Sequence, residues 1–218
     1  EKGKNMKYVL WDWNGTLLND VELGFQTINV LLREEGLAPL ATLAQYRAVF
    51  QFPVIAYYEK VGFDFEKKPF PILAQRYMEV YQPASLHCSL YAQAETALAS
   101  LHHKGKEQIL LSASQLSFLK EQLAQYDISD YFSDIWGLSD YYAHSKAELA
   151  KRMIEEKGLR KEEVVFIGDS VHDYEVACSV GCTCILVADG HQSREALLKC
   201  DAEVVEDLLG AMASIEQM

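Results

Sequence analysis

The sequence predicts an α/β fold: a doubly wound, Rossmann-like parallel sheet with an all-helical cap inserted after its first strand. Short apolar, β-favouring runs alternate with helical patterns after about residue 86. One further run of this kind lies at residues 8–11, and between residues 20 and 85 only helical patterns occur. Strands that alternate with helices indicate a parallel sheet covered on both faces. The purely helical stretch is therefore expected to be an insertion.

The first strand is expected at residues 8–11, an apolar run that ends at Asp12. Turn residues follow it. Asn19 and Asp20 are expected to cap a helix that starts near Val21 and ends before Gly36. Proline and glycine then separate three more expected helices, at residues 42–50, 54–61 and 70–81.

The remaining elements follow the insertion in regular alternation. The expected strands lie at residues 108–111, 135–136, 164–167, 183–187 and 204–205. The expected helices lie at residues 92–103, 115–126, 146–157, 171–180 and 193–199, with a last one from 207. The predicted domains are an α/β core made of residues 1–19 and 86–218, and a helical cap made of residues 20–85.

Composition narrows the range of partners. The 218 residues contain 32 Asp and Glu against 20 Lys and Arg, a formal net charge of −12. This balance disfavours binding to nucleic acids or anionic membranes. The five cysteines are odd in number and scattered, which favours a reducing compartment. We expect a cytoplasmic protein without nucleic-acid or membrane partners, either monomeric or a weak homodimer.

Chemically reactive side chains follow four of the expected strands. Asp12 ends the first strand and Ser112 the second. Lys146 opens the helix after the third, and Asp169 and Asp173 follow the fourth. Ligands of parallel α/β sheets bind outside the carboxyl ends of the strands. The inferred fold therefore predicts that these side chains meet at one edge of the sheet.

In order and spacing, these residues resemble the four signatures of the haloacid dehalogenase superfamily. The first signature, D-x-D-G-T, is resembled by Asp12-Trp13-Asn14-Gly15-Thr16. Ser112 resembles the second signature and Lys146 the third. Gly168-Asp169-Ser170-Val171-His172-Asp173 resembles the fourth, G-D-x-x-x-D. The helical insertion resembles the cap of the phosphoglycolate phosphatase and β-phosphoglucomutase branch.

The resemblance implies a Mg²⁺-dependent phosphatase of the phosphoglycolate phosphatase type that acts on a small phosphorylated metabolite. Asp12 would attack phosphorus and form an aspartyl phosphate. The implied catalytic residues are Asp12, Asn14 and Lys146. The implied metal ligands are Asp12, the backbone carbonyl of Asn14, Asp169 and, as a partner that can act through water, Asp173; such oxygens suit Mg²⁺. The implied phosphate-binding residues are Gly15, Thr16, Ser112, Ala113 and Lys146. Lys151 is the rival lysine one turn along the helix.

One position departs from the family pattern. The family has a second aspartate two residues after the nucleophile, which protonates the leaving oxygen and later activates water. This chain has Asn14 there, and an amide transfers no proton near neutral pH. Losing a positioned general acid–base costs about 10²- to 10⁴-fold in rate. Asp20, His172 or a cap residue are candidate replacements.

Three hypotheses follow from this departure. The first is a phosphatase that is slow, selective for leaving groups that need little protonation, or equipped with another acid. The second is a phosphoryl-ligand-binding or regulatory protein without turnover. The third is dehalogenation or phosphonate cleavage on the same fold. Asp169 and Asp173 weigh against a dehalogenase, which needs no metal, and a phosphonate Schiff base would need a second lysine from the cap.

The cap is expected to select the leaving group. The expected lining is residues 50–53 with nearby Tyr57 and Tyr58, although packing inside the cap explains these aromatic residues equally well. The cap also carries cations that could draw in an anion, although a solvated surface role is favoured for most of them. These cations are Arg33, Arg47, Lys60, Lys67, Lys68 and Arg76.

Overall fold

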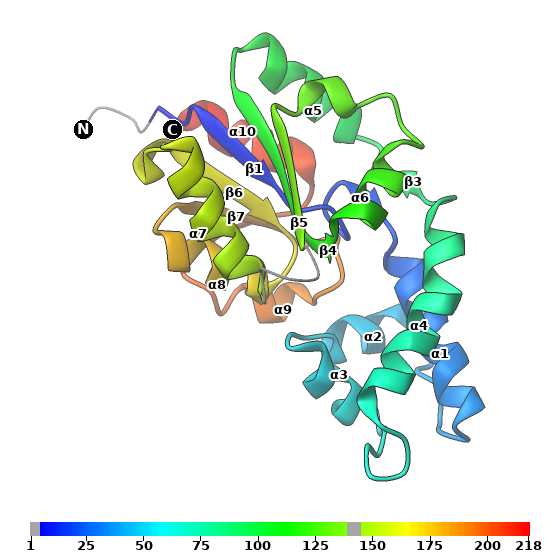
Figure 1. Cartoon of the computed structure of the whole chain (residues 1–218). Coiled ribbons are helices and arrows are strands. Elements are labelled where there is room, and N and C mark those ends of the chain that lie inside the picture. Colours follow the sequence, from blue (N-terminus) through cyan, green and yellow to red (C-terminus); the bar gives the residue numbers. More distant parts are fainter. Residues whose placement is uncertain (1–4, 139–144) are drawn as a thin grey trace.

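The computed structural model describes residues 5–138 and 145–218. Its centre is a six-stranded sheet in the order β5-β4-β1-β6-β7-β8, in which every neighbouring pair is parallel (Figure 1). The strands are β1 (Tyr8–Trp11), β4 (Glu107–Gln115), β5 (Asp134–Leu138), β6 (Val164–Gly168), β7 (Thr183–Val187) and β8 (Glu203–Val205). The sheet grows outward from β1 in both directions, which confirms the predicted doubly wound α/β fold.

Helices cover both faces of the sheet. One face packs against α5 (Ala94–His103), α6 (Leu116–Leu123) and α10 (Leu208–Gln217). The other packs against α7 (Lys146–Lys157), α8 (Val171–Val180) and α9 (Arg194–Leu197). Short 3₁₀ turns lie at Ser129–Tyr131 and Lys161–Glu163. Val9 and Trp11 belong to the first core and Leu10 to the second, as expected for a strand whose side chains alternate between faces.

Strand β1 is paired on both sides, and its register aligns the strand ends. Trp11 stands opposite Leu110 of β4 and Ile167 of β6. The backbone N–H of Asp12 then donates to the Ile167 carbonyl (2.9 Å). Asp12 therefore leaves the sheet at the same edge as the residues that follow β6. This alignment positions the site described below.

Four helices form an insertion after β1: α1 (Val21–Glu34), α2 (Leu43–Val49), α3 (Val54–Lys60) and α4 (Phe70–Ser85). Figure 1 shows them as a separate lobe beside the sheet. They enclose an apolar cluster of their own, which includes Leu31, Tyr58 and Leu73. The insertion lies within the predicted cap, residues 20–85; the division into two domains at these boundaries stays a prediction.

Two short strands join the chain segments that enter and leave the cap. β2 (Leu18–Asn19) pairs antiparallel with β3 (Ser89–Leu90). The sequence did not predict this pair, because two-residue strands leave no periodic pattern. The pairing ties both connections together at the base of the cap.

Two elements extend four residues further at their carboxyl ends than predicted. β4 continues from the expected end at residue 111 to Gln115, with an irregular register between Leu111 and Gln115. α4 continues past the expected end at residue 81, with Pro83 inside it. Tyr81 and Ser85 are buried along this last part of α4, so tertiary packing offsets the hydrogen bond that proline cannot donate. In the described part of the chain, no helix is long and apolar enough to span a membrane.

Candidate active site

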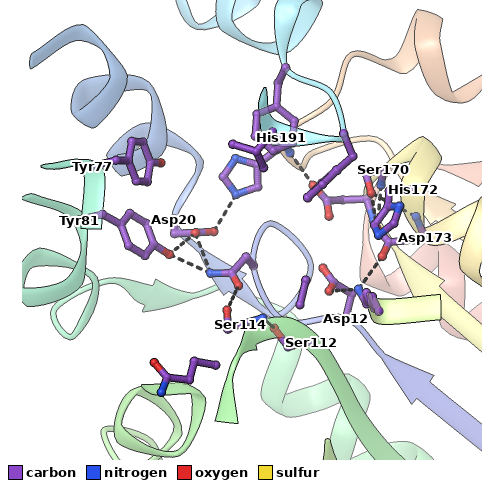
Figure 2. A pocket seen from close by; sticks show the side chains of 18 of the residues that line it. Asp12, Asp20, Tyr77, Tyr81, Ser112, Ser114, Ser170, His172, Asp173 and His191 are labelled. Atoms are coloured by element: carbon purple, nitrogen blue, oxygen red, sulfur yellow. Dashed lines mark hydrogen bonds and ion pairs between the residues drawn. The ribbon is translucent and has the colours of Figure 1, made fainter. Parts of the chain in front are cut away.

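A cavity of about 340 Å³ lies at the carboxyl edge of the sheet, between the strand ends and the cap. Asp12, Ser112, Lys146, Asp169 and Asp173 all line it. The structure thus brings together the five reactive residues that the sequence placed at strand ends. Figure 2 shows most of them facing the same space as side chains from the cap.

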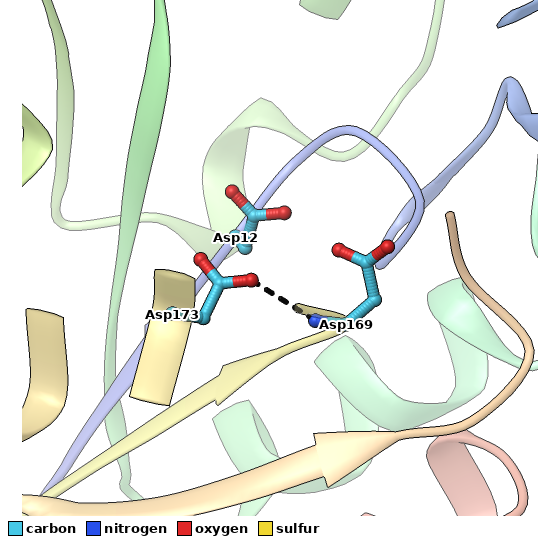
Figure 3. Close-up of side chains that lie close together, drawn as sticks. All are labelled: Asp12, Asp169 and Asp173. Atoms are coloured by element: carbon cyan, nitrogen blue, oxygen red, sulfur yellow. Dashed lines mark hydrogen bonds between the residues drawn. The ribbon is translucent and has the colours of Figure 1, made fainter. Parts of the chain in front are cut away.

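Three aspartates form a buried cluster on the core side of the cavity. One carboxylate oxygen from each of Asp12, Asp169 and Asp173 lies within 4.8 Å of the others (Figure 3). The Thr16 hydroxyl lies 3.2 Å from Asp12 Oδ2 and 3.3 Å from Asp169 Oδ1. Thr16 therefore holds the two carboxylates that are the predicted nucleophile and a predicted metal ligand.

Lys146 is the cation of this cluster. It is the first residue of α7, and its Nζ donates to Asp12 Oδ1 and to Asp173 Oδ1 (2.6 Å). Its side chain is only 3% exposed. Burial opposes the charge of the ammonium group, but the two carboxylates outweigh burial and raise the pKa of Lys146. Lys146 is therefore charged at neutral pH, as a phosphate-binding lysine requires.

Asp173 organises the start of α8. Its Oδ2 accepts hydrogen bonds from the backbone N–H of Asp169 (3.1 Å) and from the hydroxyl of Ser170 (2.7 Å). Ser170 accepts in return from the Asp173 backbone, so the two residues form a capping box. Burial opposes ionisation of Asp173, but Lys146 and these donors lower its pKa. Asp173 thus holds Lys146 and the Asp169 backbone in place.

Burial disfavours the charged forms of the other two carboxylates, Asp12 and Asp169. Burial raises the pKa of Asp12 well above its usual value, and it raises the pKa of Asp169 to about 6. Four aspartates line the cavity, including Asp20, against the two cations Lys146 and His191, which leaves a formal charge of −2. A divalent cation would balance this charge, and the donors are hard carboxylate oxygens of the kind that Mg²⁺ prefers. The residues present therefore fit Mg²⁺.

Asn14 is held by side chains from the helical insertion and from the end of β4. Its amide nitrogen donates to Asp20 Oδ2 (3.0 Å) and to the Tyr81 hydroxyl (2.8 Å). Its amide oxygen accepts from the Ser114 hydroxyl (3.0 Å). These three partners fix the orientation of the amide. The amide itself cannot transfer a proton near neutral pH.

Asp20 has a different task from the predicted helix cap. It stands at the N-cap position of α1, but its side chain makes no capping hydrogen bond. Instead, its carboxylate accepts from Asn14, the Gly15 N–H (2.8 Å), the Tyr81 hydroxyl (2.5 Å) and His191. Burial opposes ionisation, but His191 and the other donors lower the pKa of Asp20. An ionised, fully bonded Asp20 does not serve as the missing acid.

The backbone N–H groups of the turn after Asp12 have partners within the fold, and phosphate binding by Gly15 and Thr16 stays a prediction. The Gly15 N–H donates to Asp20, and the Thr16 N–H donates to the Trp13 carbonyl (3.2 Å). Both N–H groups are therefore used within the fold. Gly15 has a φ of +72°, and a Cβ there would lie 2.4 Å from Asp169 Oδ2. Glycine is required at this position for close approach of the turn to Asp169.

The predicted phosphate contacts of the second strand lie at the cavity. Ser112 and Ala113 both line it, within the extended β4. The Ser112 hydroxyl oxygen accepts from the Ser114 N–H (3.0 Å). Within the described ranges of the chain, no acceptor for its own O–H is found. Phosphate binding by Ser112 and Ala113 stays a prediction.

The sequence analysis missed His191. Its backbone N–H donates to Asp169 Oδ2 (2.6 Å), its Nε2 lies 3.1 Å from Asp20 Oδ1, and its Nδ1 lies 2.7 Å from the Tyr46 hydroxyl. Burial opposes its charge, but Asp20 raises the pKa of His191 to about 9. His191 follows the carboxyl end of β7, a strand end that the sequence reasoning left out. The same rule about strand ends was the available signal.

The predicted cap lining is half correct. Phe50 and Phe52 line the cavity. Phe52 stacks on His172, with ring centroids 4.7 Å apart. Tyr57 and Tyr58 instead pack in the apolar cluster of the cap and are 2% exposed. They lie one turn further along α3, on the side that faces the other cap helices.

Comparisons with known proteins agree with this geometry. A family model described as "Haloacid dehalogenase-like hydrolase" matches residues 9–187. The chain is 25% identical to a phosphoglycolate phosphatase of Aliivibrio fischeri, over 94% of this chain and 93% of the relative. It is 30% identical to a phosphoglycolate phosphatase of Pectobacterium atrosepticum, over 55% of this chain and 51% of that relative. A crystal structure of a predicted phosphatase from Clostridium acetobutylicum has the same fold, with a TM-score of 0.84 at 22% identity, covering 98% of this chain and 100% of the other.

Proposed function

The chain belongs to the haloacid dehalogenase-like hydrolase family, and from this premise we propose that it is a Mg²⁺-dependent phosphatase acting on a small phosphate monoester. The observation that carries the proposal is the Asp12 carboxylate, held by Lys146 and Thr16 at the floor of the cavity. The relatives named phosphoglycolate phosphatase make phosphoglycolate one substrate to test.

The residues divide the work as follows. Asp12 attacks phosphorus and carries the aspartyl phosphate. Lys146 offsets the repulsion between Asp12 and an anionic substrate, and Ser112 offers its hydroxyl to a phosphoryl oxygen. Mg²⁺, held by Asp12, Asp169 and the Asn14 carbonyl, with Asp173 as a partner, would neutralise the charge of the phosphoryl group. Thr16 and Asp173 keep these groups in position.

The test is phosphate release with Mg²⁺ from a panel of aryl and alkyl phosphates that includes phosphoglycolate. Asp12→Asn keeps the shape of the side chain but removes the nucleophile, so turnover should fall to the background rate. Asp130→Asn is the matched control, because it makes the same change at an exposed site. Turnover that persists unchanged in Asp12→Asn would reject the mechanism.

A second candidate function is supported by Asn14. A phosphoryl-ligand-binding protein without turnover would keep Lys146 and the aspartate cluster but need no acid–base at position 14. It predicts that inorganic phosphate and Mg²⁺ together raise the melting temperature while no panel member is hydrolysed. Phosphonate cleavage has less support, since Lys60, Lys67 and Lys68 contact Ala48, Asp64 and Glu35 instead of the cavity.

A further inference from the structure

The cavity has two chemically different halves. The half formed by the sheet edge carries the aspartates and Lys146. The other half is apolar and is formed mainly by the cap; its lining consists of Phe50, Phe52, Val54, Tyr77, Met78 and Phe118. Phe50 stacks on His191 with centroids 5.0 Å apart, and Tyr77 stacks on Tyr81 at 5.6 Å. The leaving group of a phosphate bound at Asp12 would occupy this apolar half.

Among residues 5–138 and 145–218, Lys146 is the only lysine or arginine that lines the cavity, and it is bonded to Asp12 and Asp173. Within this part of the chain, the apolar half therefore has no lysine or arginine. Five of the six cap cations bond elsewhere. Arg47 contacts Asp189, Arg76 contacts Glu34, and the three lysines bond as described above. Arg33 is exposed and lies outside the lining.

One of the two histidines of the lining, His191, is also turned to other partners. Both ring nitrogens of His191 are used by Asp20 and Tyr46. His172 lies against Phe52, and its Nδ1 is 3.6 Å from Glu175. Among the described residues, a carboxylate on the leaving group would therefore lose water without gaining a lysine or arginine partner, which is unfavourable.

The sheet side of the cavity adds an independent restriction. The amide of Asn14 donates to Asp20 and Tyr81 and has no proton to transfer. A leaving oxygen must therefore depart as an anion that is stable without protonation. Phenol-type oxygens meet this requirement, and alkoxides do not.

We propose that the substrate is an aryl phosphate monoester whose leaving group is neutral and apolar, bound between the rings of Phe50 and Tyr77 with its phosphate at Asp12. This proposal rests on the proposed phosphatase function and specifies its substrate class. A carboxylate-bearing alkyl phosphate, such as phosphoglycolate, is a poor substrate for this cavity.

The chemistry balances without an acid at position 14. An Asp12 oxygen forms a bond to phosphorus, the bond from phosphorus to the aryl oxygen breaks, and its electron pair leaves on the phenolate. Water then attacks the aspartyl phosphate, which returns the Asp12 carboxylate and releases phosphate and a proton. The phenolate takes up a proton from solvent. Because Asn14 activates no water, the second step is slow, and phenol release shows a burst before steady turnover.

Four substrates separate the two restrictions. Phenyl and benzyl phosphate are both apolar but differ in leaving ability; we expect kcat/KM to favour phenyl phosphate by about 10²- to 10⁴-fold. Phenyl and 3-carboxyphenyl phosphate have leaving groups of similar ability that differ in charge. We expect kcat/KM to be about 10- to 100-fold higher for phenyl phosphate. Phosphoglycolate, which is both alkyl and charged, should be the poorest of the four.

A substitution at the mouth of the cavity tests the charge restriction directly. Met78 lines the cavity and is 39% exposed, so Met78→Lys adds a cation without filling the core. We expect it to improve the use of 3-carboxyphenyl phosphate relative to phenyl phosphate by about two- to five-fold. Ile72→Lys is the matched control, because Ile72 lies on the same helix, is 51% exposed and is outside the lining.

The outcomes separate this proposal from the one on which it rests. Asp12-dependent release that favours phosphoglycolate or 3-carboxyphenyl phosphate over phenyl phosphate would overturn the substrate class and leave the phosphatase intact. Equal use of phenyl and benzyl phosphate would do the same. No Asp12-dependent release from any of the four would reject the phosphatase itself.

Discussion

At the scale of single residues, Asn14 decides how this site differs from the family pattern. Its amide nitrogen donates hydrogen bonds to the Asp20 carboxylate and the Tyr81 hydroxyl. A carboxylate at the same place would repel Asp20 and would compete with it for the Tyr81 hydroxyl. The change from acid to amide therefore removes a proton donor but suits the hydrogen-bond network around it. A mutation at position 14 therefore tests directly whether the missing acid limits hydrolysis.

Replacing Asn14 with aspartate should restore an acid. A carboxyl group beside the buried Asp20 carboxylate has a raised pKa, because two close negative charges repel each other, and so it holds a proton near neutral pH. We expect hydrolysis of benzyl phosphate to rise by about 10-fold or more, with a smaller gain for phenyl phosphate. Asn19→Asp makes the same substitution at an exposed position and serves as the control. An equal loss for both substrates would contradict this account.

Replacing Lys146 with methionine should destabilise the protein. Asp12 and Asp173 would be left buried without their cation, which typically costs about 3–5 kcal/mol. Urea unfolding with EDTA present measures this loss. Lys151→Met, on the exposed side of the same helix, should change the free energy of unfolding little. Adding Asp12→Asn to Lys146→Met should recover part of the loss; no recovery would show that packing, not charge, sets the effect.

At the scale of elements, the start of α8 couples helix capping to the acidic cluster. Ser170→Ala removes the capping box, which should cost about 1 kcal/mol of stability. It should also raise the Mg²⁺ concentration that activity requires, because Asp173, which accepts from the Asp169 backbone N–H, loses the Ser170 hydroxyl as a second donor. Asp207→Ala removes the N-cap of α10 at similar cost, and its Mg²⁺ dependence should be unchanged. The comparison fails if both variants shift the Mg²⁺ requirement equally.

A second element-scale contact docks the cap on the core. Arg47 of α2 donates to the carbonyls of Gly190 and Asp189 (both 2.9 Å), beside His191. Arg47→Met removes these bonds, and we expect KM to rise about 3- to 10-fold while kcat changes less. Steady-state kinetics on phenyl phosphate measures the split. Arg33→Met, at an exposed arginine of the same cap, should leave KM unchanged; a drop in kcat alone for Arg47→Met would argue against a docking role.

At the scale of the whole molecule, the cavity joins two bodies through one charge network. The core supplies Asp12, Asp169 and His191, and the cap supplies Tyr46 and Tyr81. The formal charge of −2 on the four aspartates, Lys146 and His191 that line the cavity makes the folded protein a better ligand for a divalent cation than the unfolded chain. Metal binding should therefore raise the free energy of unfolding.

Saturating Mg²⁺ should raise the melting temperature. At a concentration about 100 times the dissociation constant, binding adds about 2.7 kcal/mol. For a chain of this size that corresponds to roughly 5–11 °C. A thermal scan with Mg²⁺ against EDTA measures the shift, and Asp169→Asn should abolish most of it. A shift of equal size in Asp169→Asn would place the cation elsewhere.

Much of the molecule could be predicted from local patterns. Each strand of the six-stranded sheet was predicted within a few residues, because buried parallel strands are short apolar runs bounded by turn residues. Asp12, Ser112, Lys146, Asp169 and Asp173 could be grouped because parallel strands end at one edge. The helical cap was visible because no strand pattern interrupts residues 20–85.

The sequence by itself determined the fold class and the reactive set at the strand ends, since both depend on short-range patterning and on the order of elements. The tertiary structure alone decided how the remaining polar groups pair. Asp20 turns away from its helix to reach Asn14 and His191, and Gly15 donates its N–H to Asp20. These pairings join residues up to 171 positions apart, and buried donors and acceptors choose partners by proximity in space, which no local pattern records.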